Sequence, residues 1–253
     1  MRPDAPSFSE GYNADSIREE LTRPFRYCGA GCTCVCYASG SLVLKVFREP
    51  EDMVRQFRSL GIDLAAAGWS PAPGDELESA HRLQNRSIEA IQRALLELPE
   101  ETGLITCRTS AGFDGVRVAA IGPLRRQAIA LDDAFWLLQK RMDPLGRSLL
   151  SADAPTGARL IGLLVDCIER LWSRDATDRV LNFLDNYGRL DGRVAFLDVA
   201  DLAFDSDLIR KQREERRILQ SHSFRVLETS RPDLAKELVL AVSDRWRSSD
   251  EPA

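Results

Sequence analysis

The sequence predicts an α+β fold in which strands dominate the first half of the chain and helices dominate the second half. Two observations carry this prediction. Short apolar and β-branched runs are separated by turn residues between about residues 25 and 140, and apolar residues recur at helical spacing after residue 150. The 253 residues are 44% hydrophobic and 29% charged, which suffices for a buried core and excludes a chain that is disordered overall.

Charge and hydropathy exclude several classes of protein. The formal net charge of −5 argues against a protein that coats nucleic acid or lies on an anionic membrane, because phosphate binding needs clustered positive charge. No apolar run approaches the roughly 18 to 20 residues of a membrane span. Residues 1–24 also lack the apolar core of a secretory signal peptide. We therefore expect a cytoplasmic protein, or an effector delivered into another cell, with no nucleic-acid or membrane partner.

In the first half, strand signals are interrupted by two helical segments. Residues 1–24 predict a loosely ordered lead-in with one short helix, over about Ala14–Leu21. The run Phe25–Phe47 contains the turn signal Ala38-Ser39-Gly40-Ser41 and predicts a hairpin or three short strands. The further elements expected here are helices over Glu49–Leu60 and Glu76–Leu98, and strands over Gly103–Cys107, Gly115–Ile121 and Ala134–Gln139.

The second half is expected to be mostly helical. Residues 143–157 hold Pro, Gly, Ser and Asp and predict a linker, after which Ala158–Trp172 carries an apolar stripe typical of a helix. The remaining expected elements are a short strand pair over Gly188–Asp198 and helices over Ser206–Gln220 and Pro232–Arg247. These signals divide the chain into a lead-in (1–24), a β-rich part (25–142) and a helical part (143–253).

Four of the six cysteines lie within nine residues: Cys28, Cys32, Cys34 and Cys36. A Cys₄ metal site is one explanation of this cluster. In a strand, however, Cys32, Cys34 and Cys36 would stand in a row on one face, about 6 to 7 Å apart, and could not surround one ion. We expect instead small, half-buried strand residues in a reducing compartment.

Lys45 is the most informative single residue of the first half. It is one of only four lysines among 34 basic residues, and it lies inside the apolar run Leu42–Phe47. A charged group inside a strand is costly unless it is paired. Lys45 therefore either lies on an edge strand and reaches water, or presents a compact charge to a phosphate. Gly29 and Gly31, upstream, would let backbone N–H groups approach the same anion.

A second group of polar residues lies in the helical half and includes Asp178, Asn186 and Asp198. The apolar run Val194–Leu197 ends in Asp198, which places a carboxylate at a strand terminus, where it suits Mg²⁺. Asn186 precedes it by twelve residues across a predicted turn, so the two oxygens can return to neighbouring positions. A capping Asp and turn-forming Asn residues would explain the same segment without a metal.

In their order along the chain, these parts resemble the protein-kinase superfamily, and more closely the small atypical bacterial kinase-like proteins. The matching stretches are Glu100–Ile105, Phe135–Arg141 and Asn186–Asp198, and the resemblance covers about residues 25–205. It implies a two-lobed protein-kinase-like fold with a β-rich N-lobe and a reduced helical C-lobe. It also implies Mg²⁺-dependent transfer of a phosphoryl group from ATP to an acceptor that the sequence does not name, a protein being one candidate.

The resemblance also implies roles for individual residues. Gly29 and Gly31 would cover the phosphates of the nucleotide, and Lys45 would contact them. Glu89 would pair with Lys45, and Gln139 and Arg141 would belong to the hinge whose backbone meets adenine. Asn186 and Asp198 would hold Mg²⁺, and Lys45 and Asp178 would be the catalytic residues.

Three departures from the kinase pattern keep other functions open. No His-Arg-Asp precedes the Asn-bearing loop, and the usual position of the base, five residues before Asn186, is Leu181. Asp178, our choice, or Asp175 would have to serve instead. The Asp-Phe-Gly triplet is replaced by Asp198-Val199-Ala200, and no activation segment of usual length follows. The alternatives are a pseudokinase or nucleotide-binding adaptor without catalysis, and an α+β protein whose motifs are accidental.

Overall fold

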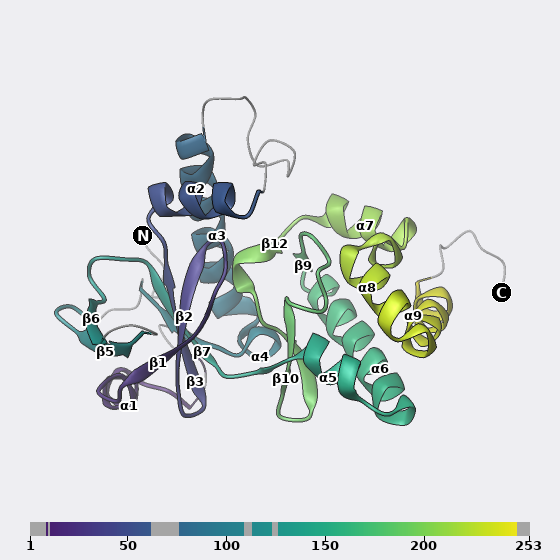
Figure 1. Ribbon diagram of the computed structural model, residues 1–253, viewed down its shortest axis with the longest axis horizontal. Coiled ribbons are helices and arrows are strands. Elements are labelled where there is room, and N and C mark those ends of the chain that lie inside the picture. Colours follow the sequence, from purple (N-terminus) through teal and green to yellow (C-terminus); the bar gives the residue numbers. More distant parts are fainter. Residues whose placement is uncertain (1–8, 10, 62–75, 109–112, 123–125, 247–253) are drawn as a thin grey trace. The chain divides into compact units, whose positions relative to one another are not determined.

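The computed structural model describes residues 9, 11–61, 76–108, 113–122 and 126–246 (Figure 1). The chain forms two compact units. The first contains residues 1–99 and 104–141, and the second contains residues 100–103 and 142–253. A seven-stranded sheet dominates the first unit and helices dominate the second, so the predicted α+β class is confirmed. Among the described residues, no helix is both long enough and apolar enough to cross a membrane.

The first unit is built on a sheet with the strand order β4-β7-β3-β2-β1-β5-β6. Neighbouring strands are antiparallel except for the parallel pair β1 and β5. The strands are β1 (Phe25–Ala30), β2 (Cys34–Ser39), β3 (Leu42–Phe47), β4 (Leu104–Cys107), β5 (Arg117–Ile121), β6 (Arg126–Ala130) and β7 (Trp136–Lys140). Of the two alternatives predicted over Phe25–Phe47, a hairpin or three short strands, the structure has the three strands, and β6 was not predicted.

A large apolar core covers one face of this sheet. Leu44 of β3 and Trp136 and Leu138 of β7 contribute to it, together with Ile17 and Leu21 of helix α1 (Ala14–Leu21). A second cluster joins α2 (Pro50–Ser59) to the long helix α3 (Glu76–Glu97), which also contacts β4. Because side chains alternate along a strand, the residues between these core positions lie on the opposite face of the sheet.

The second unit combines helices with two small sheets. The sheets have the orders β11-β10-β8 and β12-β9. The strands are β8 (Asp143–Pro144), β9 (Thr177–Asp178), β10 (Tyr187–Leu190), β11 (Arg193–Phe196) and β12 (Leu202–Ala203). The helices are α4 (Pro99–Thr102), α5 (Leu145–Ser151), α6 (Ala154–Trp172), α7 (Ser206–Glu214), α8 (His222–Ser230) and α9 (Pro232–Arg245), with 3₁₀ turns η1 (Val199–Asp201) and η2 (Arg217–Gln220).

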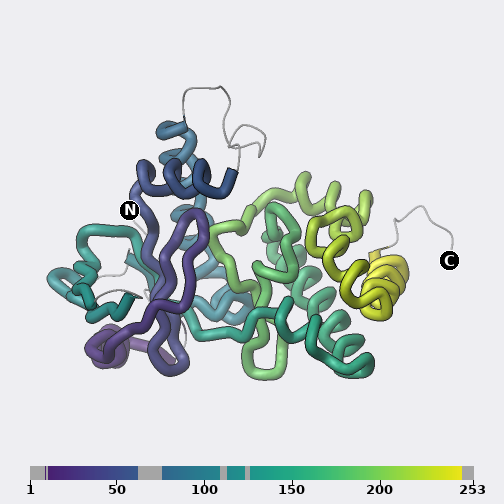
Figure 2. The backbone as a smooth tube through the Cα atoms, viewed as in Figure 1, coloured from purple at the N-terminus to yellow at the C-terminus, as the bar shows by residue number. Residues whose placement is uncertain are grey.

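Helix α6 is the centre of the second unit. It contacts α9 and β11, and α9 also contacts α8, so the last two helices run next to each other at the end of the described chain (Figure 2). Trp172 of α6 and Trp246 after α9 pack with ring centroids 4.5 Å apart. The indole N–H of Trp246 donates to Glu169, at 3.1 Å. These contacts fix the C-terminal end of α6 to the end of the described chain.

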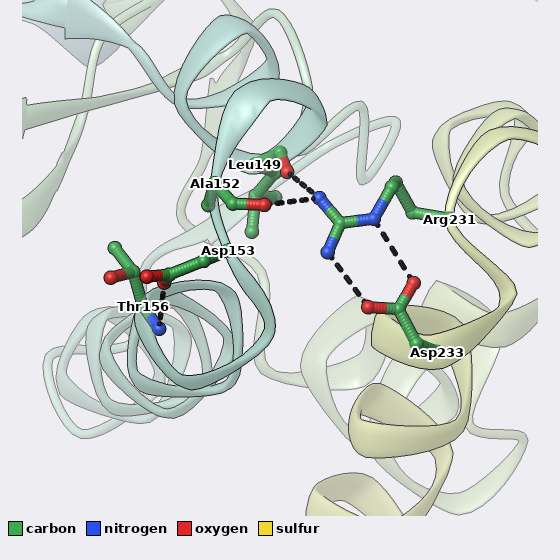
Figure 3. Close-up of polar contacts among 6 residues, drawn as sticks. All are labelled: Leu149, Ala152, Asp153, Thr156, Arg231 and Asp233. Atoms are coloured by element: carbon green, nitrogen blue, oxygen red, sulfur yellow. Dashed lines mark hydrogen bonds and ion pairs between the residues drawn. The ribbon is translucent and has the colours of Figure 1, made fainter.

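Arg231, at the junction of α8 and α9, ties the C-terminal helix pair to the start of the unit. Its guanidinium donates to the backbone carbonyls of Leu149 and Ala152, at 3.0 and 2.7 Å, and to both carboxylate oxygens of Asp233, at 3.0 and 2.7 Å (Figure 3). Asp153 caps the following helix, α6, by accepting from the Thr156 N–H. One side chain therefore donates to two carbonyls at the end of α5, where a helix lacks its usual N–H partners.

Three sequence predictions for the second unit are wrong. The linker predicted over residues 143–157 contains α5 and the first turn of α6, which Asp153 and Pro155 begin as N-cap and first-turn residues. The single helix predicted over Ser206–Gln220 is broken at Arg216, whose φ of +48° is left-handed. Helix α8, which was not predicted, begins where the Ser221 side chain accepts from the Phe224 N–H.

Candidate active site

Lys45 lies on the face of the first unit's sheet opposite the large core. Its neighbours on β3, Leu44 and Val46, both pack against that core, so Lys45 points away from it. The cross-strand partners of Lys45 are Cys36 on β2 and Leu137 on β7. Strand β3 is interior to the sheet, and Lys45 is only 7% exposed. The edge-strand explanation of Lys45 is therefore wrong.

The two glycines predicted to cover phosphates flank the turn between β1 and β2. Gly29 pairs with Cys36 next to an irregularity in the β1 register. The Gly31 N–H donates to the Cys34 carbonyl at 2.9 Å, which closes the turn, and the Arg48 side chain donates to the Gly31 carbonyl at 3.2 Å. A Cβ atom at Gly29 or Gly31 would meet nothing within 4 Å. Neither glycine is required by crowding, and the Gly31 N–H is engaged within the turn.

The other residues of the first unit that are predicted to serve nucleotide binding differ in their exposure to solvent. Gln139 is buried in β7, and Arg141 is exposed just after that strand, where its N–H donates to the Ser41 carbonyl. Glu89 lies on the exposed side of α3, whereas Lys45 is buried. The pairing of Lys45 with Glu89 and the adenine hinge at Gln139 and Arg141 stay predictions.

In the second unit, a buried amide joins two carboxylates. The Asn186 Nδ2 donates to both oxygens of Asp178, at 3.2 and 3.3 Å, and to Asp201 Oδ2, at 3.1 Å. Asn186 is 3% exposed and Asp178 is fully buried, while Asp201 is half-buried. We call these three residues the Asn186 cluster. It contains two residues that the sequence singled out and one, Asp201, that it did not.

Side-chain hydrogen bonds hold the loop that carries Asp178. The Trp172 indole N–H donates to Thr177 Oγ1 at 3.0 Å, and the Thr177 hydroxyl donates to Gln212 Oε1. Gln212 Nε2 in turn donates to the Asp178 carbonyl at 2.8 Å. The Asp178 carboxylate accepts from the Val180 N–H at 3.0 Å. Asp178 is thus fixed from both its backbone and its side chain.

Burial and a neighbouring charge change the protonation of this site. The pKa of Asp178 is raised to about 8, first by burial and then by the negative charge of Asp201, while the hydrogen bonds from Val180 and Asn186 oppose the rise. At neutral pH Asp178 therefore holds a proton, and its ionisation is opposed by repulsion from Asp201. A positive charge at this point would relieve the repulsion.

Asp198 reaches the Asn186 cluster through its backbone. Its N–H donates to the Asn186 carbonyl at 3.2 Å. Asp198 is half-buried and is the N-cap residue of the 3₁₀ turn η1, but its side chain does not cap that turn. This turn brings Asp201, three residues later, to the Asn186 side chain. The structure thus brings Asn186 together with Asp178 and Asp201, and the role of Asp198 as a metal ligand stays a prediction. The only sequence signal for Asp201 was its spacing of three residues from Asp198.

Asp175, the other candidate base, lies apart from this arrangement. It is exposed at a left-handed position with φ of +55°, and its carboxylate accepts from the Ser206 hydroxyl at 3.3 Å. Its position is explained by the local turn, because Asp tolerates the left-handed conformation better than most residues. Of the two candidates, only Asp178 contacts Asn186.

The donor set of the Asn186 cluster fits Mg²⁺. It offers two carboxylates and one amide oxygen, and Mg²⁺ usually takes few protein oxygens and keeps several waters. Among the described residues, no group of three or more His, Cys, Asp or Glu side chains could hold a metal ion. A cation at this site would accordingly depend on the amide as well as on the carboxylates.

Comparison with known proteins gives no family, and two solved structures that match the chain are distant from it in sequence. No family model matches the chain, and no curated protein matches it. A crystal structure of monomeric WbdD matches with a TM-score of 0.42 and 12% identity, over 85% of this chain and 46% of that chain. A co-crystal structure of WbdD and the kinase inhibitor LY294002 matches with a TM-score of 0.42 and 8% identity, over 88% and 48%. This chain thus spans less than half of the solved chains that it matches.

Proposed function

We propose that this protein is an ATP-dependent, kinase-like phosphotransferase in which Asp178 is the general base. The observation that carries the proposal is the Asn186 cluster, in which a buried amide from the loop before a hairpin contacts the carboxylate of a preceding loop. The chain order around it also supports the proposal, because a long helix, an Asp-bearing loop, an Asn-bearing loop and a further Asp follow one another.

In the proposed reaction, the acceptor hydroxyl oxygen attacks the γ-phosphorus of ATP. A bond forms between these two atoms while the bond from phosphorus to the β,γ-bridging oxygen breaks. ADP leaves with the electron pair, and the hydroxyl proton passes to the carboxylate of Asp178. Lys45 contributes a compact positive charge to the phosphates, and Asn186, Asp198 and Asp201 contribute oxygen ligands for the cation. Mg²⁺, when bound, supplies the charge that neutralises the phosphate oxygens.

Asn186 would have a second task in this proposal. Its amide nitrogen faces the two carboxylates, whereas a cation needs its oxygen. Turning the amide oxygen to a cation would free the Asp178 oxygens from this donor, and the positive charge of the cation would favour the ionised carboxylate that a base requires. Binding of the cation and activation of the base are then one event.

A nucleotide-binding adaptor without catalysis is the second candidate, and one observation favours it. Asp178 is fully buried, and both of its carboxylate oxygens already accept hydrogen bonds. A base in that condition cannot reach a hydroxyl until the Asn186 amide moves. An adaptor would keep the cluster closed and use it only for stability.

Two matched variants separate these functions. We expect Asp178→Asn to lower transfer of radiolabel from ATP by at least about 100-fold, because a general base contributes about that much, and to keep thermal stabilisation by Mg-ATP. Asp175→Asn, the control in the same loop, should match the parent in both assays, because it is exposed and outside the cluster.

The outcomes differ for each hypothesis. Transfer by Asp178→Asn at the parent rate would show that the base is assigned wrongly. Stabilisation of the parent by Mg-ATP with no transfer to any acceptor would establish the adaptor. A parent protein that neither Mg-ATP nor ATP alone stabilises would end the nucleotide hypothesis altogether.

A further inference from the structure

A polar cavity of about 350 Å³ adjoins the loop of Asp178 and plays no part in the function proposed above. Arg179, Val180 and Leu181, which follow Asp178 directly, form one wall. The other wall comes from Gln212 on α7 and from Arg217, Gln220 and Ser221 around η2. All of these described lining residues belong to the second unit.

The cavity wall and the candidate base share one turn of the chain. The Val180 N–H donates to the Asp178 carboxylate, and Leu181 takes a left-handed φ of +51° that is unusual for a branched side chain. On the other wall, Arg216 is also left-handed, with φ of +48°, and this conformation ends α7 so that Arg217 follows on a new turn. Both walls thus depend on strained positions, which folded proteins retain where the surrounding structure requires them.

Internal hydrogen bonds hold the polar side chains of the rim in place. Ser221 Oγ accepts from the Phe224 N–H and donates to the Ile218 carbonyl, at 3.1 and 2.7 Å. Gln220 Nε2 donates to the Glu215 carbonyl at 2.9 Å. The Gln212 side chain accepts from the Thr177 hydroxyl and donates to the Asp178 carbonyl. A site whose walls are ordered in advance binds its ligand without the full entropic cost of arranging them.

The charge of the lining is positive. Its charged side chains are Arg179 and Arg217, and among the described lining residues there is no carboxylate. Arg179 donates one N–H to the Leu202 carbonyl at 3.2 Å, which anchors its guanidinium. Arg217 approaches the neighbouring Glu215 at 3.6 Å, but both side chains are about half exposed, so this ion pair is weak and easily exchanged. Two guanidinium groups lining one cavity suit an oxyanion.

We infer that this cavity binds the phosphate group of a small, hydroxyl-bearing acceptor molecule. Its description as an acceptor site rests on the proposed function, whereas anion binding does not. A phosphate monoester has three non-bridging oxygens and can accept from two guanidinium forks, whereas a carboxylate is matched by one. The volume is within the range of cavities that enclose small molecules, and the shared turn places the ligand beside the segment that holds Asp178.

The first test measures anion binding in the absence of nucleotide. Inorganic phosphate is titrated by calorimetry at constant ionic strength, with chloride as the balancing anion. We expect saturable binding to the parent, and at least tenfold weaker binding to Arg217→Gln. Arg213→Gln is the matched control, because Arg213 is an exposed residue of α7 outside the cavity and its loss changes the net charge equally. The melting temperature of each variant without phosphate shows that the fold is kept.

Equal loss of phosphate binding in the Arg217→Gln and Arg213→Gln proteins, or no saturable binding to the parent, overturns the inference. The second test compares small phosphate esters that carry hydroxyl groups with their dephosphorylated counterparts as acceptors of radiolabel from ATP. We expect transfer to a phosphate ester in the parent and its loss in Arg217→Gln. Transfer that ignores the phosphate group overturns the acceptor assignment. Phosphate binding that depends on Arg217, in a protein that Mg-ATP does not stabilise, would instead refute the proposed function and leave the anion site standing.

Discussion

The two units place their candidate functional residues by different means. In the first unit, Lys45 is positioned by backbone pairing, because β3 is held between β2 and β7 through a continuous register. In the second unit, Asp178 lies in a two-residue strand, and its position depends on side chains of Asn186, Gln212 and Thr177. A sheet tolerates the loss of one side chain without losing its ladder, whereas a loop held by side chains does not.

The largest expected effect is that of Asn186→Ala. It removes the donor shared by two carboxylates in a buried site, so we expect the free energy of unfolding to fall by about 3 kcal/mol. Equilibrium urea denaturation measures the change. Asn85→Ala, at an exposed position of α3, should stay within about 0.5 kcal/mol of the parent. Equal stability of the two variants would mean that the loop does not depend on its side-chain bonds.

The next effect is a pH dependence of stability that belongs to the second unit. The pKa of Asp178 is about 8 in the folded chain against a usual 3.8, so between these values the folded state holds a proton that the unfolded state releases. Stability is therefore fully present below the unfolded pKa and is lost as the pH rises towards 8, by at most about 1.4 kcal/mol per pH unit.

Urea denaturation at several pH values between 5 and 8, with a metal chelator present, measures this slope. Asp178→Asn should flatten it, because the substituted side chain does not titrate, while Asp175→Asn should keep the slope of the parent. A slope that survives in Asp178→Asn would assign the pH dependence to another group.

The smallest expected change in stability is that of Lys45→Met. Methionine has a similar length and no charge to desolvate, and β3 keeps its pairing on both sides, so we expect a change below about 1 kcal/mol. Under the proposed function, the same variant loses stabilisation by Mg-ATP, because the charge that meets the phosphates is gone. Thermal unfolding with and without Mg-ATP measures both quantities. A large loss of stability without nucleotide would show that the Lys45 charge holds the sheet together.

The same contrast explains which features the sequence could predict. Strands β1 to β3, the long helices α3 and α6 and the hairpin β10–β11 follow from hydrophobic periodicity and turn residues, and their approximate bounds were found. The Asn186 cluster was found only in part. Asp201 reaches Asn186 through a 3₁₀ turn, and Gln212 is a buried residue on a helix whose sequence is mostly polar.

Breaks at non-glycine residues were also beyond prediction. Leu181 and Arg216 take left-handed conformations. Neither residue is of a type that favours this conformation, so the local sequence does not predict it. They are the positions that shape the cavity beside Asp178. Hydrophobic periodicity predicts which face of a helix or strand is buried. It does not predict where side-chain hydrogen bonds change the direction of a loop.

Arg231 has a consequence for how far the chain can be shortened. Because its guanidinium donates to the Leu149 and Ala152 carbonyls, a fragment that ends before Arg231 would leave both carbonyls without this donor. A fragment that ends before Trp246 would also lose the ring that packs on Trp172. Trp172 precedes Thr177 by only five residues. The shortest piece of the second unit that folds by itself therefore extends to Trp246, although every candidate catalytic residue precedes Asp205.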